Sequence, residues 1–454
     1  MGNAAISLSQ AAAWCGGTVA LEYENTCVCG ANFDTRRLQP GELFVAIRGA
    51  RNGHEFVPAA MKAGAAAVLA SEDLPWQVPA IYVKDTVNAL QKIAAGYRKT
   101  LSCRCVGITG SVGKTTTKEM IAAVLKTTFK TQKTAANYNN DIGVPVSVLS
   151  LDRDCEAAVL EMGMNHKGEL AVLTKIARPD LAVITNVGTM HIENLGSREG
   201  ILRAKLEILE GLRPGGPVIF CGDNDLLRRE AEKYSAICFG MEENNEVRGT
   251  DVRMEDGKTF FTIHARGQKI PVTLPVTGQH NVLNALCAAA VGLQMGVSPE
   301  NIQAGLRNFH NTGMRQNIYE KNGVTVIADC YNAGPESMKA ALDVLGRQKG
   351  RRIAVLGGML ELGDYAEEAH FEVGTEAAMC ADLLFAYGPC SEQYVEGARK
   401  FKMASAQSYE THAELAAALG KTMKAGDVLL FKGSHGMHME KVLELLHLQS
   451  KGDK

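Results

Sequence analysis

A strand-like run, a glycine-rich turn and a helix-like run follow one another directly after residue 105. The segment reads Val106-Gly-Ile-Thr-Gly-Ser-Val-Gly-Lys-Thr-Thr116. A turn of this kind presents backbone N–H groups and a helix N-terminus to phosphate oxygens. In that arrangement Lys114 would reach the β- and γ-phosphates of a nucleoside triphosphate, and the Thr115 hydroxyl would ligate Mg²⁺. Isoleucine stands at 108, where the strict motif has glycine, so T-G-S-V-G-K-T is a narrower variant of the phosphate-binding loop (P-loop).

Strand-like and helix-like runs also alternate along the rest of the chain. Apolar strand-like runs end at Glu161, at Thr185 and near Cys221, and such alternation predicts a parallel sheet covered by helices. Between about 245 and 276, period-2 runs surround Glu255-Asp-Gly-Lys258, which predicts a hairpin. We therefore expect an α/β fold in three domains. These are an N-terminal α/β domain (1–98), a central parallel-sheet P-loop domain (99–312) and a C-terminal Rossmann-like α/β domain (313–454).

Periodicity also predicts particular elements within these domains. The expected strands span 41–47, 80–83, 324–328, 353–356, 383–387 and 428–431. The expected helices span 55–67, 87–99 and 281–295.

Composition narrows the classes of partner. The 454 residues carry 48 basic and 50 acidic side chains, and a chain without basic excess is a poor candidate for general nucleic-acid binding. No apolar run approaches the 18 residues of a membrane span, and the first residues lack a signal-peptide pattern. The twelve cysteines are scattered, without the C-x-x-C spacing of common zinc sites. We expect reduced thiols, a cytoplasmic location, and neither a membrane nor a nucleic acid as partner.

Two polar residues follow apolar strands and predict a metal site beside the P-loop. Glu161 ends one strand, and His191 lies a few residues beyond the next. The C-terminal ends of parallel strands line the ligand crevice of such sheets, so both side chains can face the triphosphate. Carboxylate and imidazole suit a divalent metal, although Mg²⁺ usually prefers oxygen. Composition alone favours a solvated helix lysine for Lys205.

An amide-rich segment, Thr134-Ala-Ala-Asn-Tyr-Asn-Asn-Asp-Ile-Gly143, follows the P-loop helix. Such a segment can orient the polar groups of a substrate. It can equally be a turn with capping residues, because Asn and Asp side chains commonly bond to nearby backbone groups. The residues alone leave both interpretations open.

The order of these motifs resembles the Mur amide ligases of peptidoglycan synthesis. The resemblance includes N-Y-N-N-D-I-G-V-P from Asn137, E-M-G-M-N-H from Glu161, N-V-G-T-M-H from Asn186, A-K-L-E-I from Ala204 and G-Q-H-N-V-L-N-A from Gly278. D-C-Y-N-A-G-P-E-S-M from Asp329 and G-M-L-E-L-G from Gly358 are similar to the MurF branch. That branch joins UDP-N-acetylmuramoyl-tripeptide to D-alanyl-D-alanine, using ATP and Mg²⁺ and forming an acyl phosphate and ADP.

The resemblance implies roles for individual residues. It places Lys114, Lys205, His191, Asp329 and Arg315 in the catalytic set. Nucleotide binding falls to Thr109, Gly110, Ser111, Val112, Gly113, Lys114, Thr115, Asn281, Asn284, Asp329 and Asn332. Substrate binding falls to Thr35, Arg36 and Arg51 near the UDP moiety, and to Asn137, Asn140, Asn165 and His166. Two metal sites are implied, held by Thr115, Glu161, His191 and Lys205, with Lys205 carboxylated on its nitrogen. A monomer is expected.

Three positions depart from the pattern of the branch, and several alternatives stay open. Gly358 stands where aspartate is common, Gly334 where asparagine is usual, and His435 where an arginine is common. These departures concern dipeptide binding and domain closure. The alternatives are another ligase of the same superfamily, of the amino-acid-adding or folylpolyglutamate synthase type, a P-loop motor or GTPase, and an inactive binding module. The chain lacks the Asn-Lys-x-Asp signature of GTPases and retains Lys114, Glu161 and His191.

Overall fold

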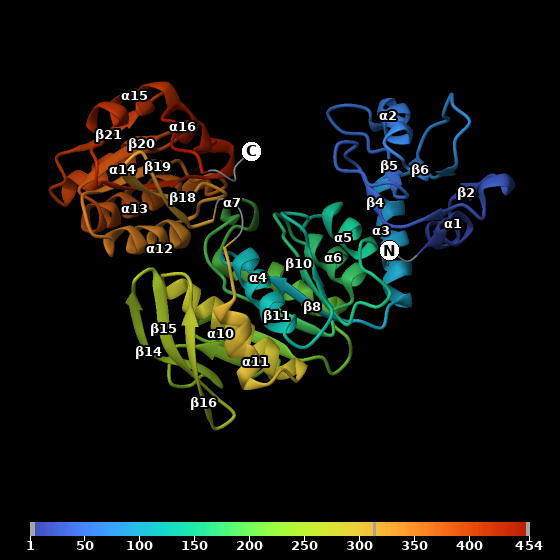
Figure 1. Ribbon diagram of the computed structural model, residues 1–454, viewed down its shortest axis with the longest axis horizontal. Coiled ribbons are helices and arrows are strands. Elements are labelled where there is room, and N and C mark those ends of the chain that lie inside the picture. The colour runs from blue at the N-terminus through green and yellow to red at the C-terminus, as the bar shows by residue number, and fades with distance from the viewer. Residues whose placement is uncertain (1–4, 312–314, 451–454) are drawn as a thin grey trace.

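The computed structural model describes residues 5–311 and 315–450 and forms three α/β units (Figure 1). The N-terminal and C-terminal units lie over opposite ends of the central unit (Figure 1). The α/β class and the three-unit layout are those expected from the alternating pattern. Among the helices formed by described residues, none has the length and apolar character needed to cross a membrane.

The N-terminal unit contains a five-stranded sheet in the order β2-β7-β6-β5-β4 and a two-stranded β1-β3 sheet. Its strands are β1 (Ile6–Ser7), β2 (Thr18–Val19), β3 (Cys27–Val28), β4 (Ala31–Asn32), β5 (Leu43–Val45), β6 (Ala67–Ala70) and β7 (Ala80–Tyr82). Its helices are α1 (Leu8–Cys15), η1 (Leu21–Tyr23), η2 (Gly53–Phe56), α2 (Val57–Lys62) and α3 (Thr86–Thr100). The helix expected over 55–67 is shorter and broken. A proline near its start favours a new helix at Val57, and Gly64, with φ +99°, follows its end.

The central unit is built on a nine-stranded sheet in the order β16-β15-β14-β13-β12-β11-β8-β10-β9. Its strands are β8 (Arg104–Thr109), β9 (Thr131–Lys133), β10 (Ala157–Glu161), β11 (Leu181–Ile184), β12 (Val218–Cys221), β13 (Ile237–Gly240), β14 (Val247–Glu255), β15 (Lys258–Ala265) and β16 (Gln268–Leu274). Its helices are α4 (Lys114–Leu125), α5 (Gly143–Leu149), α6 (Glu169–Ala177), α7 (Ile192–Leu195), α8 (Arg198–Leu206), η3 (Glu207–Gly211), α9 (Asp225–Ala231), α10 (Gln279–Met295) and α11 (Pro299–Arg307). Strands β8 to β14 pair in parallel, and the expected hairpin adds β15 and β16 antiparallel.

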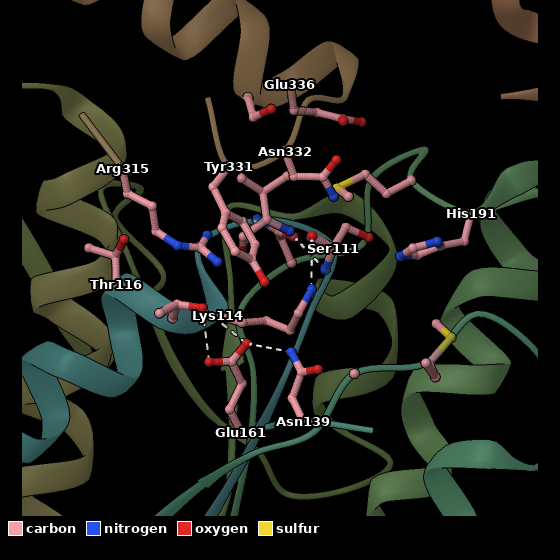
Figure 2. A pocket seen from close by; sticks show the side chains of 18 of the residues that line it. Ser111, Lys114, Thr116, Asn139, Glu161, His191, Arg315, Tyr331, Asn332 and Glu336 are labelled. Carbon is pink, nitrogen blue, oxygen red and sulfur yellow. Dashed lines mark hydrogen bonds between the residues drawn. The ribbon is translucent and has the colours of Figure 1, made fainter. Parts of the chain in front are cut away.

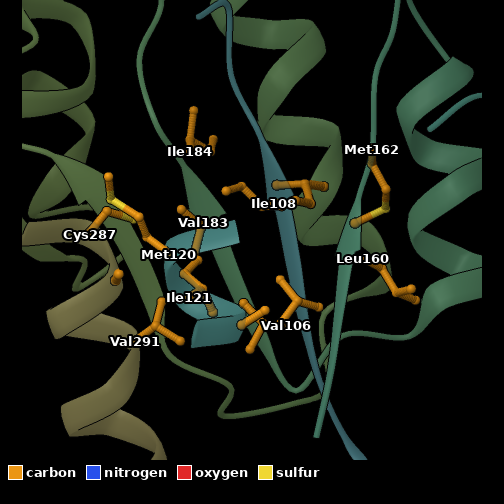
Figure 3. Close-up of a cluster of buried hydrophobic side chains, with 14 of the residues drawn as sticks. Val106, Ile108, Met120, Ile121, Leu160, Met162, Val183, Ile184, Cys287 and Val291 are labelled. Atoms are coloured by element: carbon orange, nitrogen blue, oxygen red, sulfur yellow. The ribbon is translucent and has the colours of Figure 1, made fainter. Parts of the chain in front are cut away.

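Strand β8 occupies the interior of this sheet, between β10 and β11. Its Val106 and Ile108 are fully buried among apolar side chains of α4, α10 and the neighbouring strands (Figure 3). A parallel strand covered on both faces needs such a continuous apolar run. The burial fixes where β8 ends, and therefore where the glycine turn begins.

The described residues of the C-terminal unit form a six-stranded sheet in the order β17-β18-β22-β19-β20-β21, in which β17 pairs antiparallel with β18 and the other pairs are parallel. Its strands are β17 (Asn317–Lys321), β18 (Val324–Asp329), β19 (Arg352–Gly357), β20 (Leu383–Tyr387), β21 (Ala406–Tyr409) and β22 (Val428–Lys432). Its helices are α12 (Pro335–Gly346), η4 (Gly363–Tyr365), α13 (Ala366–Cys380), α14 (Ser391–Lys400), α15 (His412–Thr422), η5 (His435–Met437) and α16 (Glu440–Leu445).

The two domain boundaries stay predictions. Helix α3 runs without a break through the boundary placed at 98/99. The boundary at 312/313 lies outside the described residues.

The end of α3 is fixed to the central unit by Arg98, whose side chain is fully buried. Its guanidinium donates to the carbonyl oxygens of Ala177 at 2.8 Å and Cys103 at 3.2 Å, and to Asp180 at 3.3 Å. Asp180 in turn accepts from the backbone N–H of Cys105, at the start of β8, at 2.7 Å. Arg98 thus joins the helix from the first unit to the strand that carries the P-loop.

We expect Arg98→Met to destabilise the protein by about 3–5 kcal/mol, because it leaves buried carbonyls and a carboxylate without their donor. The loss should appear as a lower midpoint of thermal unfolding. Lys99→Met, at the exposed neighbouring position, is the control. Equal midpoints for the two variants would contradict the role given to Arg98.

Candidate active site

A cavity of about 690 Å³ lies where the central and C-terminal units meet (Figure 2). The central unit contributes the P-loop, the amide-rich segment, the end of β10 and the first turns of α10. The C-terminal unit contributes Arg315, Asp329, Tyr331, Asn332 and Lys432. Residues more than 300 positions apart in the sequence therefore line the same cavity.

The P-loop has the conformation that its glycines predict. Gly110 and Gly113 have φ of +153° and +81°, and a Cβ at Gly113 would lie 2.7 Å from Asn284 Oδ1. The Lys114 ammonium donates to the carbonyl oxygens of Gly110 at 2.8 Å and Ser111 at 3.2 Å. Burial lowers the pKa of Lys114, and the Arg315 charge adds to this, while Glu161 opposes it.

Asn186 holds the turn from the adjacent strand end. Its Oδ1 accepts from the backbone N–H of Ser111 at 3.0 Å and of Val112 at 2.9 Å. The Ser111 hydroxyl accepts from the N–H of Gly188 at 3.0 Å. Asn186 lies within a motif that the sequence singled out, but its own role was not predicted.

Oxygen ligands for a metal gather at the start of α4. The Thr115 hydroxyl lies 2.9 and 3.0 Å from the two Glu161 carboxylate oxygens, and Asn139 donates to Glu161 Oε1 at 2.9 Å. Hydroxyl and carboxylate oxygens are the donors Mg²⁺ prefers, so these residues fit that ion. No group of three or more His, Cys, Asp and Glu side chains placed to hold a metal occurs in residues 5–311 and 315–450.

A buried lysine that the sequence did not single out supports the same carboxylate. Lys118 Nζ lies 3.4 Å from Glu161 Oε2 and donates to the carbonyl of Ala136 at 3.3 Å. Burial lowers the pKa of Lys118, and the Glu161 charge opposes the shift. Lys118 thereby links the amide-rich segment to Glu161.

His191 enters the cavity from the side opposite Arg315 (Figure 2). It precedes α7 with φ +66°, an unfavourable conformation for a non-glycine residue. Its Nδ1 lies 2.5 Å from Glu361 Oε2 of the C-terminal unit. This contact lowers the pKa of the Glu361 carboxyl.

Lys205 is buried in the last turn of α8. Burial lowers the pKa of its ammonium well below the ordinary value, and the nearby Lys114 charge adds to the shift. A lysine in this setting is far from the solvated surface residue that composition alone favoured.

Asn281 and Asn284, both buried, lie on α10 at one end of the cavity. Asn281 Nδ2 donates to Gln316 Oε1 at 2.8 Å, and Asn284 Oδ1 accepts from the Thr117 hydroxyl at 3.0 Å. Gln316 belongs to the C-terminal unit and also donates to the carbonyl of Thr277 at 2.9 Å. No sequence signal pointed to Gln316, because its side-chain contacts with His280, Asn281 and Thr277 form only where the two units meet.

Asp329 and Arg315 are held by partners in the C-terminal unit. Asp329 Oδ2 pairs with the buried Lys432 ammonium at 2.7 Å, and Lys432 also donates to the carbonyl of Asn332 at 2.9 Å. The Arg315 guanidinium lies over the Tyr331 ring, 3.8 Å from its centre. Lys432 is a further cavity residue that the sequence reasoning missed.

The predicted UDP-binding residues lie in the N-terminal unit and do not line this cavity. Arg36 is exposed and pairs with Asp34 at 2.7 Å, which lowers the pKa of Asp34 to about 2. Thr35 is partly buried, and the Arg51 guanidinium lies 4.5 Å from the centre of the Phe56 ring.

Tyr138 connects that unit to the amide-rich segment. Arg37 donates to the Tyr138 hydroxyl at 3.3 Å, and the Phe33 ring lies 6.0 Å from the Tyr138 ring. These contacts place the N-terminal unit beside the segment that borders the P-loop cavity. Neither Arg37 nor Tyr138 was predicted as a site residue.

The remaining predicted substrate residues divide into two groups. Asn140 and Asn165 line the cavity. Asn137 and His166 are exposed and do not line it, and His166 lies 3.1 Å from Glu169. Within the amide-rich segment, the side chain that reaches Glu161 belongs to Asn139, which was not predicted.

Two of the three departures from the branch pattern occupy tight positions. A Cβ at Gly358 would lie 2.8 Å from the carbonyl oxygen of Pro389, and one at Gly334 would lie 2.8 Å from Met190 Cγ. A larger residue at either position needs a shift of its neighbours. His435 is exposed, and its ring lies 5.9 Å from that of Tyr331.

Comparison with known proteins finds relatives that match the central and C-terminal parts of the chain. The models for the Mur ligase middle domain and the Mur ligase glutamate ligase domain match residues 108–292 and 314–435. A UDP-N-acetylmuramoyl-tripeptide–D-alanyl-D-alanine ligase of Bacillus subtilis (strain 168) is 42% identical over 93% of this chain and 94% of its own length.

Solved structures superpose over most of the chain. The crystal structure of MurF from Acinetobacter baumannii superposes with a TM-score of 0.90 at 31% identity, covering 99% of this chain and 100% of that one. MurF ligase from Thermotoga maritima in complex with ADP superposes with a TM-score of 0.79 at 31% identity, covering 92% and 96%.

The fold and the cavity define a P-loop protein whose phosphate-binding turn faces a second α/β unit. With the relatives in view, the chain belongs to the Mur ligase family, and within it to the MurF branch.

We expect Asn186→Asp to raise the KM for ATP about tenfold or more, because it keeps the acceptor for the two P-loop N–H groups but adds a negative charge beside the phosphates. Steady-state kinetics with varied Mg·ATP measures the change. Asn194→Asp, at an exposed position on α7, is the control. An unchanged KM at position 186 would show that the triphosphate lies elsewhere.

Proposed function

We propose that the protein joins the peptide carboxylate of UDP-N-acetylmuramoyl-tripeptide to the amine of D-alanyl-D-alanine, converting ATP to ADP and phosphate. The observation that carries the proposal is the continuity of the cavity. The P-loop, the Thr115–Glu161 pair and the amide-rich segment share one space, and the last of these contacts the N-terminal unit through Tyr138. The relatives named above support the same substrates.

The first step forms an acyl phosphate. An oxygen of the tripeptide carboxylate attacks the γ-phosphorus of ATP, the bond to the β,γ-bridging oxygen breaks, and ADP leaves. Lys114 and Arg315 supply positive charge where negative charge accumulates on the transferred phosphoryl group. Asn281 and Asn284 would meet the adenine, with Asp329 and Asn332 near the ribose and phosphates.

The second step forms the amide. The neutral amine of the dipeptide attacks the acyl carbon, the C–O bond to phosphate breaks, and phosphate leaves, while the amine releases one proton. Acyl phosphates hydrolyse in water, so the central and C-terminal units must exclude solvent during both steps. Contacts between the two units, such as Glu336 accepting from the N–H of Thr189 at 2.9 Å, suit that requirement.

The proposal includes two metal ions, one at each of the predicted metal sites. Thr115 and Glu161 would hold the Mg²⁺ of ATP, and His191 with N-carboxylated Lys205 would hold a second ion. Bound Mg²⁺ neutralises charge on the phosphates and on the attacking carboxylate. Burial of Lys205 favours the neutral amine that reacts with CO₂.

We further propose that the protein works as a monomer in the cytoplasm, with no membrane or nucleic-acid partner. The described residues of a single chain place the P-loop, Glu161 and Arg315 around one cavity, which supports a single-chain active site.

The direct test is phosphate release from Mg·ATP by the purified protein with UDP-N-acetylmuramoyl-tripeptide present. We expect release to require D-alanyl-D-alanine, and to be much slower with D-alanine or with no amine. Release independent of any amine would indicate a hydrolase, and absence of release under all conditions would indicate an inactive binding module.

We expect Lys205→Ala to lower the rate of ligation at least about 100-fold. The substitution removes the N-carboxylated side chain that would hold the second metal ion, and with it the charge stabilisation which that ion supplies to the reacting groups. Added short carboxylates should partly restore activity by replacing the lost carboxylate. Lys175→Ala, which removes an exposed lysine paired with Glu210, should have no effect. Full activity of Lys205→Ala without added carboxylate would refute the metal-holding role.

A further inference from the structure

A loop of the C-terminal unit, residues 358–362, meets the central unit beside His191. The Glu361 carboxylate contacts His191, and the Glu361 carbonyl oxygen lies 3.5 Å from the N–H of Glu193 on α7. Residues 360–362 also line a second cavity, of about 230 Å³, which shares His191 with the P-loop cavity. The loop therefore borders the space that adjoins the P-loop cavity on its His191 side.

The conformation of this loop depends on side chains from other elements. Glu361 has φ +63°, and strained backbone of this kind persists only where its surroundings impose it. The N–H of Met359 donates to His370 Nε2 at 2.9 Å, and the N–H of Leu360 donates to Ser434 Oγ at 2.9 Å. His370 lies on α13, Ser434 follows β22, and both are buried. Two buried side chains thus hold the backbone directly before Glu361.

His370 makes its bond to the loop in one tautomer. Its Nδ1 lies 2.6 Å from the carbonyl oxygen of Ala366, one turn earlier on α13. A carbonyl oxygen accepts and a backbone N–H donates, so Nδ1 carries the hydrogen and Nε2 offers its lone pair to Met359. Burial lowers the pKa of His370, which keeps the ring neutral near pH 7. The imidazole therefore joins α13 to the loop with one nitrogen on each.

We propose that His370 is a positioning residue for ligation, which holds the loop against α7 and so keeps water from the acyl phosphate until the amine reacts. The inference rests on the proposed function, because the acyl phosphate is the intermediate of that reaction. If water reaches this intermediate, the bond between the acyl group and phosphate breaks, and the carboxylate, phosphate and a proton are released. One ATP is then consumed without formation of an amide.

His370→Leu tests the role because it removes the acceptor for the Met359 N–H and leaves an apolar side chain in the buried site. We expect the amide formed per ATP consumed to fall about twofold or more, since the held state of the loop loses a hydrogen bond worth about 5- to 10-fold in its equilibrium. The KM for ATP should stay within about twofold of wild type, because the P-loop lies on the central unit. Phosphate and amide are measured in the same reaction.

Three further variants separate the role of this bond from a general effect on the fold. His370→Gln, whose side-chain oxygen can accept from the same N–H, should restore part of the coupling. Ser434→Ala removes the acceptor for the Leu360 N–H and should lower the coupling as well, which provides a second test if His370→Leu is unstable. His264→Leu removes a half-buried histidine that bonds to Thr250 on the hairpin, and should still form one amide per ATP.

Hydrogen exchange followed by mass spectrometry provides a readout that needs no substrate. In His370→Leu we expect faster exchange in the peptide covering residues 357–363 and in the peptide covering residues 189–196, because Glu361 joins the loop to α7. Both peptides should exchange as in wild type in His264→Leu. Faster exchange confined to α13 would mean that His370 stabilises only its own helix, and would overturn the proposal.

The stoichiometry distinguishes failure of this inference from failure of the proposed function. If wild type and His370→Leu both form one amide per ATP, whatever their rates, the positioning role is wrong and the proposed function stands. If wild type releases phosphate without forming an amide, the proposed function is wrong and the inference falls with it. In a Glu361→Ala background, His370→Leu should lower the coupling no further, because His370 acts through Glu361; additive losses would contradict that route.

Discussion

The turn between β8 and α4 is the constraint on which the rest of the site depends. β8 is buried inside the nine-stranded sheet, so its last residue has a fixed position, and Asn186 holds the turn from the neighbouring strand. Lys114 and Thr115 then begin α4 at the same edge where β10 ends in Glu161. Parallel strands bring their carboxyl ends to one edge, and this geometry brings the P-loop, the Thr115 hydroxyl and the Glu161 carboxylate together.

The C-terminal unit supplies the remaining contacts around the cavity at the edge of the central sheet. Gln316 bonds to Asn281 on α10, Glu336 bonds to Thr189, and Glu361 meets His191. All three contacts join the central and C-terminal units around the cavity. An enzyme that forms an acyl phosphate has to keep water from it, and a site built from two units can admit substrates when they separate and exclude water when they meet.

Much of this arrangement was predictable because its signals are local. The apolar runs that end at Glu161 and Tyr387 correspond to β10 and β20, and the glycine turn lies between strand and helix as its sequence indicates. One prediction from local periodicity was wrong in its bounds. The helix expected over 55–67 is interrupted where proline and glycine change the backbone conformation. The roles given to Thr35, Asn137 and His166 stay predictions.

Gln316, Lys432, Asn139 and Glu361 escaped prediction for a different reason. Each owes its place to a partner in another element, as Lys432 does to Asp329 across 103 residues, and no spacing in the sequence encodes such contacts. The most direct test of the account is a crystal structure of the protein with Mg²⁺, a non-hydrolysable ATP analogue and the UDP-tripeptide. The account predicts the triphosphate along residues 110–115, with a metal ion between Thr115 and Glu161 in place of their hydrogen bond. A triphosphate bound away from this turn, or a Thr115–Glu161 hydrogen bond that persists beside it, would contradict the account.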